Sequence, residues 1–232
     1  MPSVFPDRAR NRIDLRVAGE DRRVAVTPRE LVIAGFTARA RDAVRHHIEE
    51  LVREGVPRPT AVPAFYRVDA GLLTTARTIT VRSARTSGEA EPVLICATDG
   101  WYVGLGSDHT DRDLEREDIE RSKAACPKVI ATEVLPYEFA AARWDDLRLR
   151  SWSSSWSAPY QDGSAGELLP IPELLEKLGA TDVTEGTVVF CGTVGLATDG
   201  FVFGDEFRAE LELPGEQRIA LSYRIDLKDG RG

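Results

Sequence analysis

The sequence predicts one mostly β domain with a few helices, of the α+β class. Segments such as "TITVRS", "PVLICA" and "WYVGL" are rich in β-branched and aromatic residues, and Gly, Ser and Asp separate them. The 232 residues, 42% of them hydrophobic, suffice for a substantial core. No repeat or linker divides the chain. We therefore expect residues 1–20 to form an N-terminal tail and residues 21–232 to form a single domain.

The first elements after the tail are two strands and a helix. "RRVAV" and "ELVIAG" are typical of short strands. In residues 36–54, apolar side chains such as Val44, Ile48 and Leu51 recur at helical spacing, which predicts an amphipathic helix. The three prolines of "GVPRPTAVPA" then end this helix, because proline cannot continue it.

Strands dominate the rest of the chain. "LRLRSWSSSWS" alternates at period two, and would place Trp152 and Trp156 on one face of a regular strand. "GTVVFCGT" is typical of a buried strand, whereas "EFRAELEL" and "RIALSYRI" predict a closing hairpin. Helices are expected over residues 114–125 and over "PIPELLEKLG", which has Pro at its start and Gly at its end.

Charge and cysteine content exclude several classes of protein. The net charge is −8 and no run of Lys or Arg occurs, which argues against a nucleic-acid or anionic-membrane surface and favours a small-molecule partner. The three cysteines are far apart and odd in number, as expected for reduced thiols. No segment has the length of a signal peptide or of a membrane span. We expect a soluble, cytoplasmic protein.

Three acidic residues form a candidate metal site. Glu89 and Glu91 in "GEAEPVLI" would lie on the same face of a strand, where two like charges repel unless a cation or solvent compensates. Asp108 ends the next strand, and an antiparallel pair would bring it to the start of the first. Three converging carboxylates suit Mg²⁺ or Mn²⁺. The alternative is a solvated acidic loop.

Other side chains are candidates for catalysis. His47 and Glu50 lie one helical turn apart, so that His47 could act as a general base toward water; His46 turns toward the polar side and is the less favoured partner. Lys123 could bind a carboxylate or an enolate oxygen. Alternatively, the helix has a mixed-charge surface and the lysine is solvated. Cys126 and Cys191 could be nucleophiles, but Cys191 lies in "VVFCGT", which is typical of a buried strand, where cysteine is usually inert.

The order of several motifs resembles the fumarylacetoacetate hydrolase superfamily. "EAEPVLI", "SDHTDRDLE" and "SKAACP" resemble its E-x-E, its N-D-x-T-A-R-D-L-Q and its lysine segment, and "YQDG", "EGTVVFCGTVG" and "GDEFRAEL" follow in the family's order. Near the N-terminus, "AGFTARARDAVRHHIEEL…VPRPTAVPAFYR" is similar to a glycine turn, an H-x-x-E helix and a proline-rich segment, with Arg67 near the place of a lysine.

The resemblance implies a fold, a metal site and a range of reactions. The fold would be a mixed β-sandwich roll of the fumarylacetoacetase C-terminal type, commonly a homodimer. Mg²⁺ or Mn²⁺ would be held by Glu89, Glu91 and Asp108. The side chains Arg67, Gln161 and Thr193 would bind the substrate. Departures from the family include Ser107 in place of Asn and only sixteen residues between Glu91 and Asp108.

Three functional hypotheses follow. The leading one is a metal-dependent hydrolase that cleaves a carbon–carbon bond in a β-diketo or oxo acid, with water activated by His47 and Glu50 and an enolate stabilised by the metal and Lys123. The second keeps the metal but performs decarboxylation, isomerisation or condensation. The third is a non-catalytic binding protein. In the acidic loop, Arg112 and Asp113 are expected to pair with each other, and His109 is expected to have no catalytic role.

Overall fold

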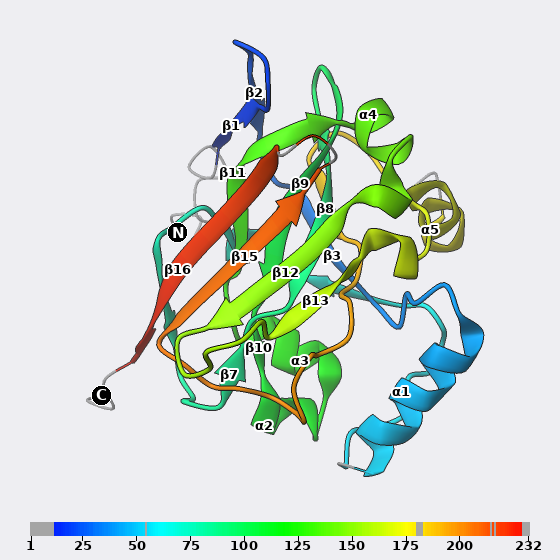
Figure 1. The fold of residues 1–232 in the computed structure, drawn as a ribbon, viewed down its shortest axis with the longest axis vertical. Coiled ribbons are helices and arrows are strands. Elements are labelled where there is room, and N and C mark those ends of the chain that lie inside the picture. Colours follow the sequence, from blue (N-terminus) through cyan, green and yellow to red (C-terminus); the bar gives the residue numbers. More distant parts are fainter. Residues whose placement is uncertain (1–11, 54, 180–182, 214, 216, 229–232) are drawn as a thin grey trace, which may run out of the picture.

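The computed structural model describes residues 12–53, 55–179, 183–213, 215 and 217–228, and within α1 it leaves out the side chains of His47 and Glu50. Strands predominate and the helices are short, so the predicted mostly β class with a few helices is confirmed. The strands form two large mixed sheets and one small antiparallel pair (Figure 1).

The larger sheet has nine strands. Its order is β2-β1-β11-β9-β8-β14-β3-β4, and β5 pairs with β11 in addition. β8 and β9 form an antiparallel hairpin, while β14 runs parallel to β3. The strands are β1 Ile13–Val17, β2 Arg23–Val26, β3 Glu30–Gly35, β4 Ala64–Val68, β5 Leu73–Thr74, β8 Ala90–Ala97, β9 Gly100–Asp108, β11 Lys128–Pro136 and β14 Thr187–Phe190.

The second sheet has five strands in the order β13-β12-β15-β16-β6. β15 and β16 form the hairpin that the alternation predicted, with Glu206 paired to Arg224 at one end and Glu212 to Arg218 at the other. A separate pair joins β7 and β10. The strands are β6 Thr78–Val81, β7 Thr86–Ser87, β10 Thr110–Asp111, β12 Arg148–Ser153, β13 Gln161–Ser164, β15 Glu206–Glu212 and β16 Arg218–Leu227.

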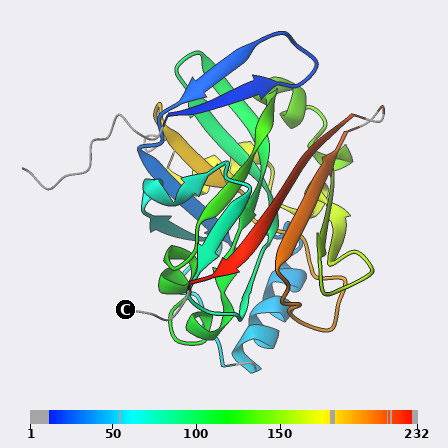
Figure 2. The ribbon, with the colours of Figure 1, turned by 90° about the vertical axis from the view of Figure 1, so that its left-hand side faces the viewer.

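The core lies between the two sheets. β16, β15, β12 and β13 lie in front of β11, β9 and β8, and the turned view shows the β15–β16 hairpin apart from the larger sheet (Figures 1 and 2). One continuous apolar cluster joins Leu94 and Val103 of the larger sheet to Leu149, Leu211 and Ile219 of the smaller one. β2 contacts β8 across the larger sheet, so that this sheet curls over a second cluster on its other face. The predicted sandwich roll is therefore present.

Short helices connect the strands. α1 begins later than predicted, because Phe36 has a positive φ of 59° that no helix accommodates. The helix expected over residues 114–125 is two helices, each capped by an aspartate side chain, Asp111 for α2 and Asp118 for α3. Gly179, with a φ of 97°, ends α5 as predicted. The helices are α1 Arg41–Arg53, α2 Arg112–Glu115, α3 Ile119–Ala124, α4 Tyr137–Ala141 and α5 Ile171–Leu178.

Several elements differ from the sequence-based expectation. Residues 13–17, which we expected in the tail of residues 1–20, form β1 inside the larger sheet; residues 1–11 lie outside the described part. β11 was not predicted at all, although it pairs with β9. The strand expected through Trp156 ends at Ser153, so the two tryptophans do not share a strand face. Among the described residues, no helix is long and apolar enough to cross a membrane.

Candidate metal centre and active site

The β8–β9 hairpin brings the three predicted metal ligands together. Its register pairs Ala90 with Ser107, so that Glu89, just before β8, lies beside Asp108 at the end of β9. The backbone N–H of Asp108 donates to the carbonyl oxygen of Glu89 at 3.0 Å. The tight turn at Thr98 and Asp99 accounts for the short spacing in the sequence. The carboxylates of Glu89, Glu91 and Asp108 therefore converge as the antiparallel arrangement predicted.

The geometry of these carboxylates fits a divalent cation. One oxygen from each of Glu89, Glu91 and Asp108 lies within 4.8 Å of the others. Asp108 Oδ1 is buried, and it lies 3.0 Å from the ammonium nitrogen of Lys128. Burial, together with the charge of Asp108, raises the pKa of Glu91 well above its ordinary value. A bound cation would offset that cost, and oxygen donors are the ligands that Mg²⁺ and Mn²⁺ prefer.

Three basic side chains surround the carboxylates. Lys123 of α3 forms an ion pair with Asp108 and lies 3.8 Å from Glu89. Lys128, the first residue of β11, lies 3.0 Å from Asp108 Oδ1. Arg112 of α2 is 3.2 Å from Glu89 and 2.9 Å from Glu115. Glu89, Asp108 and Glu115 therefore each have a partner of opposite charge, whereas Glu91 accepts a hydrogen bond from the backbone N–H of Gly192.

These pairs control which groups are ionised. Burial alone would raise the pKa of Asp108, but the ammonium groups of Lys123 and Lys128 outweigh burial and lower it to about 2. Burial would lower the pKa of Lys123, but Asp108 and Glu89 raise it instead, so Lys123 stays protonated. Burial lowers the pKa of Lys128 although Asp108 opposes the shift. The centre thus holds a permanently charged carboxylate between two lysines.

A cavity of about 720 Å³ opens over this centre. Glu89, Glu91, Arg112, Glu115 and Lys123 contribute its charged base. Most of its wall is apolar, as is common for small-molecule sites. The wall residues come from the β3–α1 region, from α1 and α3, and from the loops after the 3-10 helix Ala165–Glu167 and after β14; among them are Ala34, Phe36, Ala38, Ala43, Val44, Leu51, Ile119, Leu168, Val194, Leu196 and Phe201. α1 lies outside the two sheets (Figure 1), and its residues Val44, His46 and Leu51 line the cavity.

The helix that carries the predicted base borders the cavity. His47 and Glu50 lie on α1, but their side chains lie outside the described part of the structure. His46, which we expected on the polar side of the helix, lines the cavity. Both histidines therefore remain candidates for the general base.

The predicted substrate-binding residues lie in different surroundings. Arg67 of β4 is exposed and forms an ion pair with Glu30 at 2.8 Å, whereas its neighbour Tyr66 lines the cavity. Thr193 also lines the cavity, and its hydroxyl donates to the carbonyl oxygen of Ala90. The described structure thus brings Thr193, and not Arg67, to the carboxylates.

Gln161 supports the carboxylates from behind. Its amide oxygen accepts from the Ala90 N–H at 2.9 Å and from Ser151 Oγ, and its amide nitrogen donates to Thr193 Oγ1 and to the Val194 carbonyl. Four protein partners occupy a side chain that has two donors and two acceptor positions. Gln161 therefore holds the backbone at Ala90, between Glu89 and Glu91. The sequence analysis did not predict this supporting role.

The acidic loop is paired differently from the prediction. Arg112 binds Glu89 and Glu115, and its guanidinium lies 4.0 Å from the ring centre of Phe201; Asp113 instead pairs with Arg85. The expected pair of Arg112 with Asp113 is therefore wrong, and Arg112 is a cavity residue that the sequence analysis missed. Its place in "SDHTDRDLE", within a motif already singled out, was the available signal.

His109 is buried and hydrogen-bonded through both ring nitrogens. Its two ring nitrogens lie 2.9 Å from the Tyr223 hydroxyl and 2.9 Å from Thr86 Oγ1. Burial, reinforced by Lys128 and Arg112, lowers the pKa of His109 to about 3. A neutral, fully buried ring with both nitrogens engaged cannot exchange protons with a substrate in the cavity.

The cysteines carry no sign of activation. Cys96, Cys126 and Cys191 are all buried and free. Burial raises the pKa of Cys126 to about 11 and that of Cys191 to about 12, which disfavours the nucleophilic thiolate. The cysteine-hydrolase alternative has no support in this site.

Comparison with known protein families places the chain among relatives. A family profile described as "Protein of unknown function (DUF2848)" matches residues 34–223. The chain belongs to this family. The DUF2848 region includes all three carboxylates, Lys123 and Lys128, so the whole candidate centre lies inside it. A sequence search among curated proteins found no match.

Solved structures share the fold. A fumarylpyruvate hydrolase from Pseudomonas aeruginosa, solved in complex with Mn²⁺ and pyruvate, matches with a TM-score of 0.62 at 17% identity, over 98% of this chain and all of that one. A 2-keto-3-deoxyarabinonate dehydratase matches with a TM-score of 0.60 at 16% identity, over 87% of this chain and 74% of that one. The resemblance to the fumarylacetoacetate hydrolase superfamily is confirmed as a likeness of fold.

Proposed function

We propose that the protein is a metal-dependent enzyme that cleaves a carbon–carbon bond in a β-diketo or oxo acid by hydrolysis. One observation carries the proposal: the carboxylates of Glu89, Glu91 and Asp108 have oxygens within 4.8 Å of one another, and Glu89 and Glu91 line a cavity that Lys123 and Arg112 also line. The structural relative with Mn²⁺ and pyruvate supports the same class of ligand. We expect Mg²⁺ or Mn²⁺ as the cofactor.

The side chains of this centre would divide the work. Glu89, Glu91 and Asp108 would hold the cation, which when bound supplies Lewis-acid polarisation of the substrate's oxygens. Lys123 and Arg112 keep their positive charges and line the base of the cavity, so they would orient the substrate's carboxylate and stabilise negative charge that develops on an enolate oxygen. The apolar wall would exclude water from the remaining volume.

Hydrolysis also needs a base that removes a proton from water. We assign this role to His47, with Glu50 one turn along α1 as its partner, and keep His46 as the alternative because it lines the cavity. Separate His46→Gln and His47→Gln variants decide between them. Loss of turnover in only one variant identifies the base, and unchanged turnover in both excludes α1 as its source.

The metal assignment is tested by Glu89→Gln, which keeps the size of the side chain and removes its charge. Calorimetric titration with Mn²⁺ and turnover of candidate oxo acids should both fail in this variant. Glu117→Gln is the matched control, because Glu117 is an exposed acid between α2 and α3, the helices that carry Arg112 and Lys123. Normal turnover by a Glu89→Gln protein that binds no metal would exclude the proposed function.

A decarboxylase, isomerase or condensing enzyme is the second candidate. Such a reaction would need no base that activates water, and it would use the cationic side chains Lys123 and Arg112 that already line the cavity. The dehydratase among the structural relatives also shows that this fold is not restricted to hydrolases. Turnover in ¹⁸O-labelled water separates the two, because only hydrolysis places solvent oxygen in the new carboxylate.

Two further expectations can be tested with the purified protein. We expect a homodimer, which light scattering after size-exclusion chromatography would measure directly. A non-catalytic binding protein is the remaining alternative. Failure to bind Mg²⁺ or Mn²⁺ at millimolar concentration, together with no turnover of any oxo acid, would favour that alternative.

A further inference from the structure

Lys128 is a buried charge that the proposed reaction does not use. The chain has only four lysines, and two of them, Lys123 and Lys128, contact Asp108. The register of β9 and β11 pairs Lys128 directly with Asp108, so the strand pairing itself places the two residues opposite each other. Lys128 is fully buried and is not among the residues that line the cavity. It therefore approaches Asp108 from behind, away from any substrate.

The surroundings of Lys128 match a charged ammonium group. Its Nζ atom donates to the carbonyl oxygens of His109, at 2.6 Å, and of Lys123, and lies 3.0 Å from Asp108 Oδ1. An ammonium has three N–H donors, and these are three oxygen atoms. The contacts also join the end of β9 to the last turn of α3. Lys128 thus fixes both Asp108 and the segment that carries Lys123.

This charge has a consequence for metal binding. A cation bound to Asp108 and the ammonium of Lys128 would share the same carboxylate, and two positive charges within a few ångströms repel strongly in a buried site. At the same time, Lys128 lets Asp108 remain ionised inside the protein when no cation is present. The two effects of Lys128 oppose each other: it keeps Asp108 ionised when no cation is bound, and it lowers the affinity of the site for a cation.

We propose that Lys128 is a built-in counter-ion of Asp108, which keeps the carboxylate centre assembled without a divalent cation and makes the bound cation weakly held and exchangeable. This inference rests on the metal site of the proposed function. It assigns the affinity of that site to a residue outside the cavity. If Lys128 had only a structural role, its removal would instead weaken metal binding, because Asp108 would be held less firmly.

The test is Lys128→Met, which keeps the length of the side chain and removes its charge. Without metal, the variant should unfold about 10 °C below the wild type, because Asp108 loses one of its two counter-ions. In calorimetric titration it should bind Mn²⁺ more tightly, on the order of tenfold or more. Saturating Mn²⁺ should also raise its unfolding temperature by more than it raises that of the wild type.

Two further variants separate charge from packing. Lys128→Arg keeps the charge and should bind Mn²⁺ as the wild type does. Lys128→Gln keeps a donor toward the two carbonyl oxygens and should resemble Lys128→Met in its tighter binding. If Lys128→Met is unfolded without metal, recovery of its native circular dichroism with Mn²⁺ supports the inference, and failure to recover at saturating Mn²⁺ overturns it.

The results distinguish this inference from the proposed function. Unchanged or weaker Mn²⁺ binding by a folded Lys128→Met protein, with normal binding by the wild type, overturns the counter-ion role and leaves the metal site intact. Tighter Mn²⁺ binding by Lys128→Met and Lys128→Gln, but not by Lys128→Arg, supports it. Absence of Mn²⁺ binding in both proteins overturns the metal site itself, and this inference with it.

Discussion

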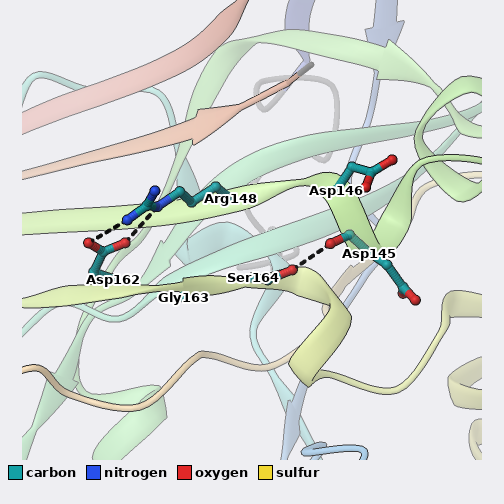
Figure 3. A pocket seen from close by; sticks show the side chains of 6 residues that line it. All are labelled: Asp145, Asp146, Arg148, Asp162, Gly163 and Ser164. Carbon is teal, nitrogen blue, oxygen red and sulfur yellow. Dashed lines mark hydrogen bonds and ion pairs between the residues drawn. The ribbon is translucent and has the colours of Figure 1, made fainter.

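Two acid–base groups of the molecule use similar side chains in opposite surroundings. In the outer group, on the five-stranded sheet, Arg148 of β12 and Asp162 of β13 face each other through two hydrogen bonds of 2.8 Å, beside a shallow depression (Figure 3). In the inner group, at the end of β9, Asp108 lies between Lys123 and Lys128. In both groups the basic partner lowers the pKa of the aspartate.

Exposure makes the difference between them. The side chains of Arg148 and Asp162 are 55% and 29% exposed, whereas those of Asp108 and Lys128 are both 0% exposed. Water can replace either partner of the outer pair at little cost. Asp108 and Lys128 are shielded from solvent, so the removal of one charge leaves the other without compensation by water. The pair beside the depression therefore contributes little to stability although it has the same kinds of side chain. In the inner group, by contrast, each charge depends on its buried partners.

The largest difference between the two regions should be the dependence of stability on pH. His109, next to Asp108, has a pKa of about 3 in the folded chain against an ordinary value of 6.5. Between these two pH values His109 binds a proton in the unfolded chain but not in the folded chain. The contribution of His109 to the free energy of unfolding is therefore fully present above pH 6.5 and is lost as the pH is lowered toward 3. The expected slope is about 1.4 kcal/mol per pH unit, up to about 5 kcal/mol in all.

Urea unfolding of the wild type and of His109→Gln at several pH values measures this effect. The difference between the two proteins isolates His109 from the carboxylates, because Glu91 titrates in the opposite sense. Equal slopes in both proteins would show that His109 is not buried as a neutral ring. Asp162 in the outer group can contribute only below about pH 4, since its pKa is already lower than its ordinary value.

Removal of the inner carboxylate should come next in size. Asp108→Asn leaves Lys123 and Lys128 without their shared negative charge, and should cost about 4 kcal/mol in the free energy of unfolding of the metal-free protein. Chemical denaturation checks this value. A loss below about 1 kcal/mol would mean that the inner group relaxes as easily as a surface pair, and the contrast between the groups would disappear.

The sequence predicted the three carboxylates of the candidate metal site, but not the side chains that hold them in place. Glu89, Glu91 and Asp108 were recognisable because the period of a strand and the antiparallel register place them together. Lys128 was not, because a single lysine at the start of an unpredicted strand has no local pattern. The four partners of Gln161 come from segments far apart in the chain, and such packing is not encoded in any short window of sequence.

The fold showed the same division. The period-two alternation of β15 and β16 predicted their hairpin correctly, because one face is buried and the other exposed. The continuous burial at the start of β11 leaves no such alternation, and the strand was missed. A positive φ at Phe36 and the aspartate caps of α2 and α3 moved helix boundaries that apolar spacing alone could not locate.

A smaller effect is expected where the backbone touches the inner group. Gly192 donates its N–H to Glu91 at 2.8 Å and has a φ of 100°, and an added Cβ would lie 1.8 Å from Thr37 Oγ1. Gly192→Ala should therefore cost about 3 kcal/mol and weaken Mn²⁺ binding. Gly195→Ala is the matched control in the same loop, because its added Cβ meets no atom within 4 Å. Equal stability of the two variants would show that the loop does not hold Glu91.

The outer pair should give the smallest effect. Asp162→Asn removes the charge that faces Arg148 but keeps an oxygen that can accept from it, and water can solvate the freed guanidinium. The unfolding temperature should change by no more than about 2 °C, and the change should shrink further in high salt, which screens exposed charges. Thermal unfolding at low and high salt, beside Asp108→Asn under the same conditions, makes the comparison direct. A loss for Asp162→Asn as large as that for Asp108→Asn, and equally insensitive to salt, would show that burial is not what distinguishes the two groups.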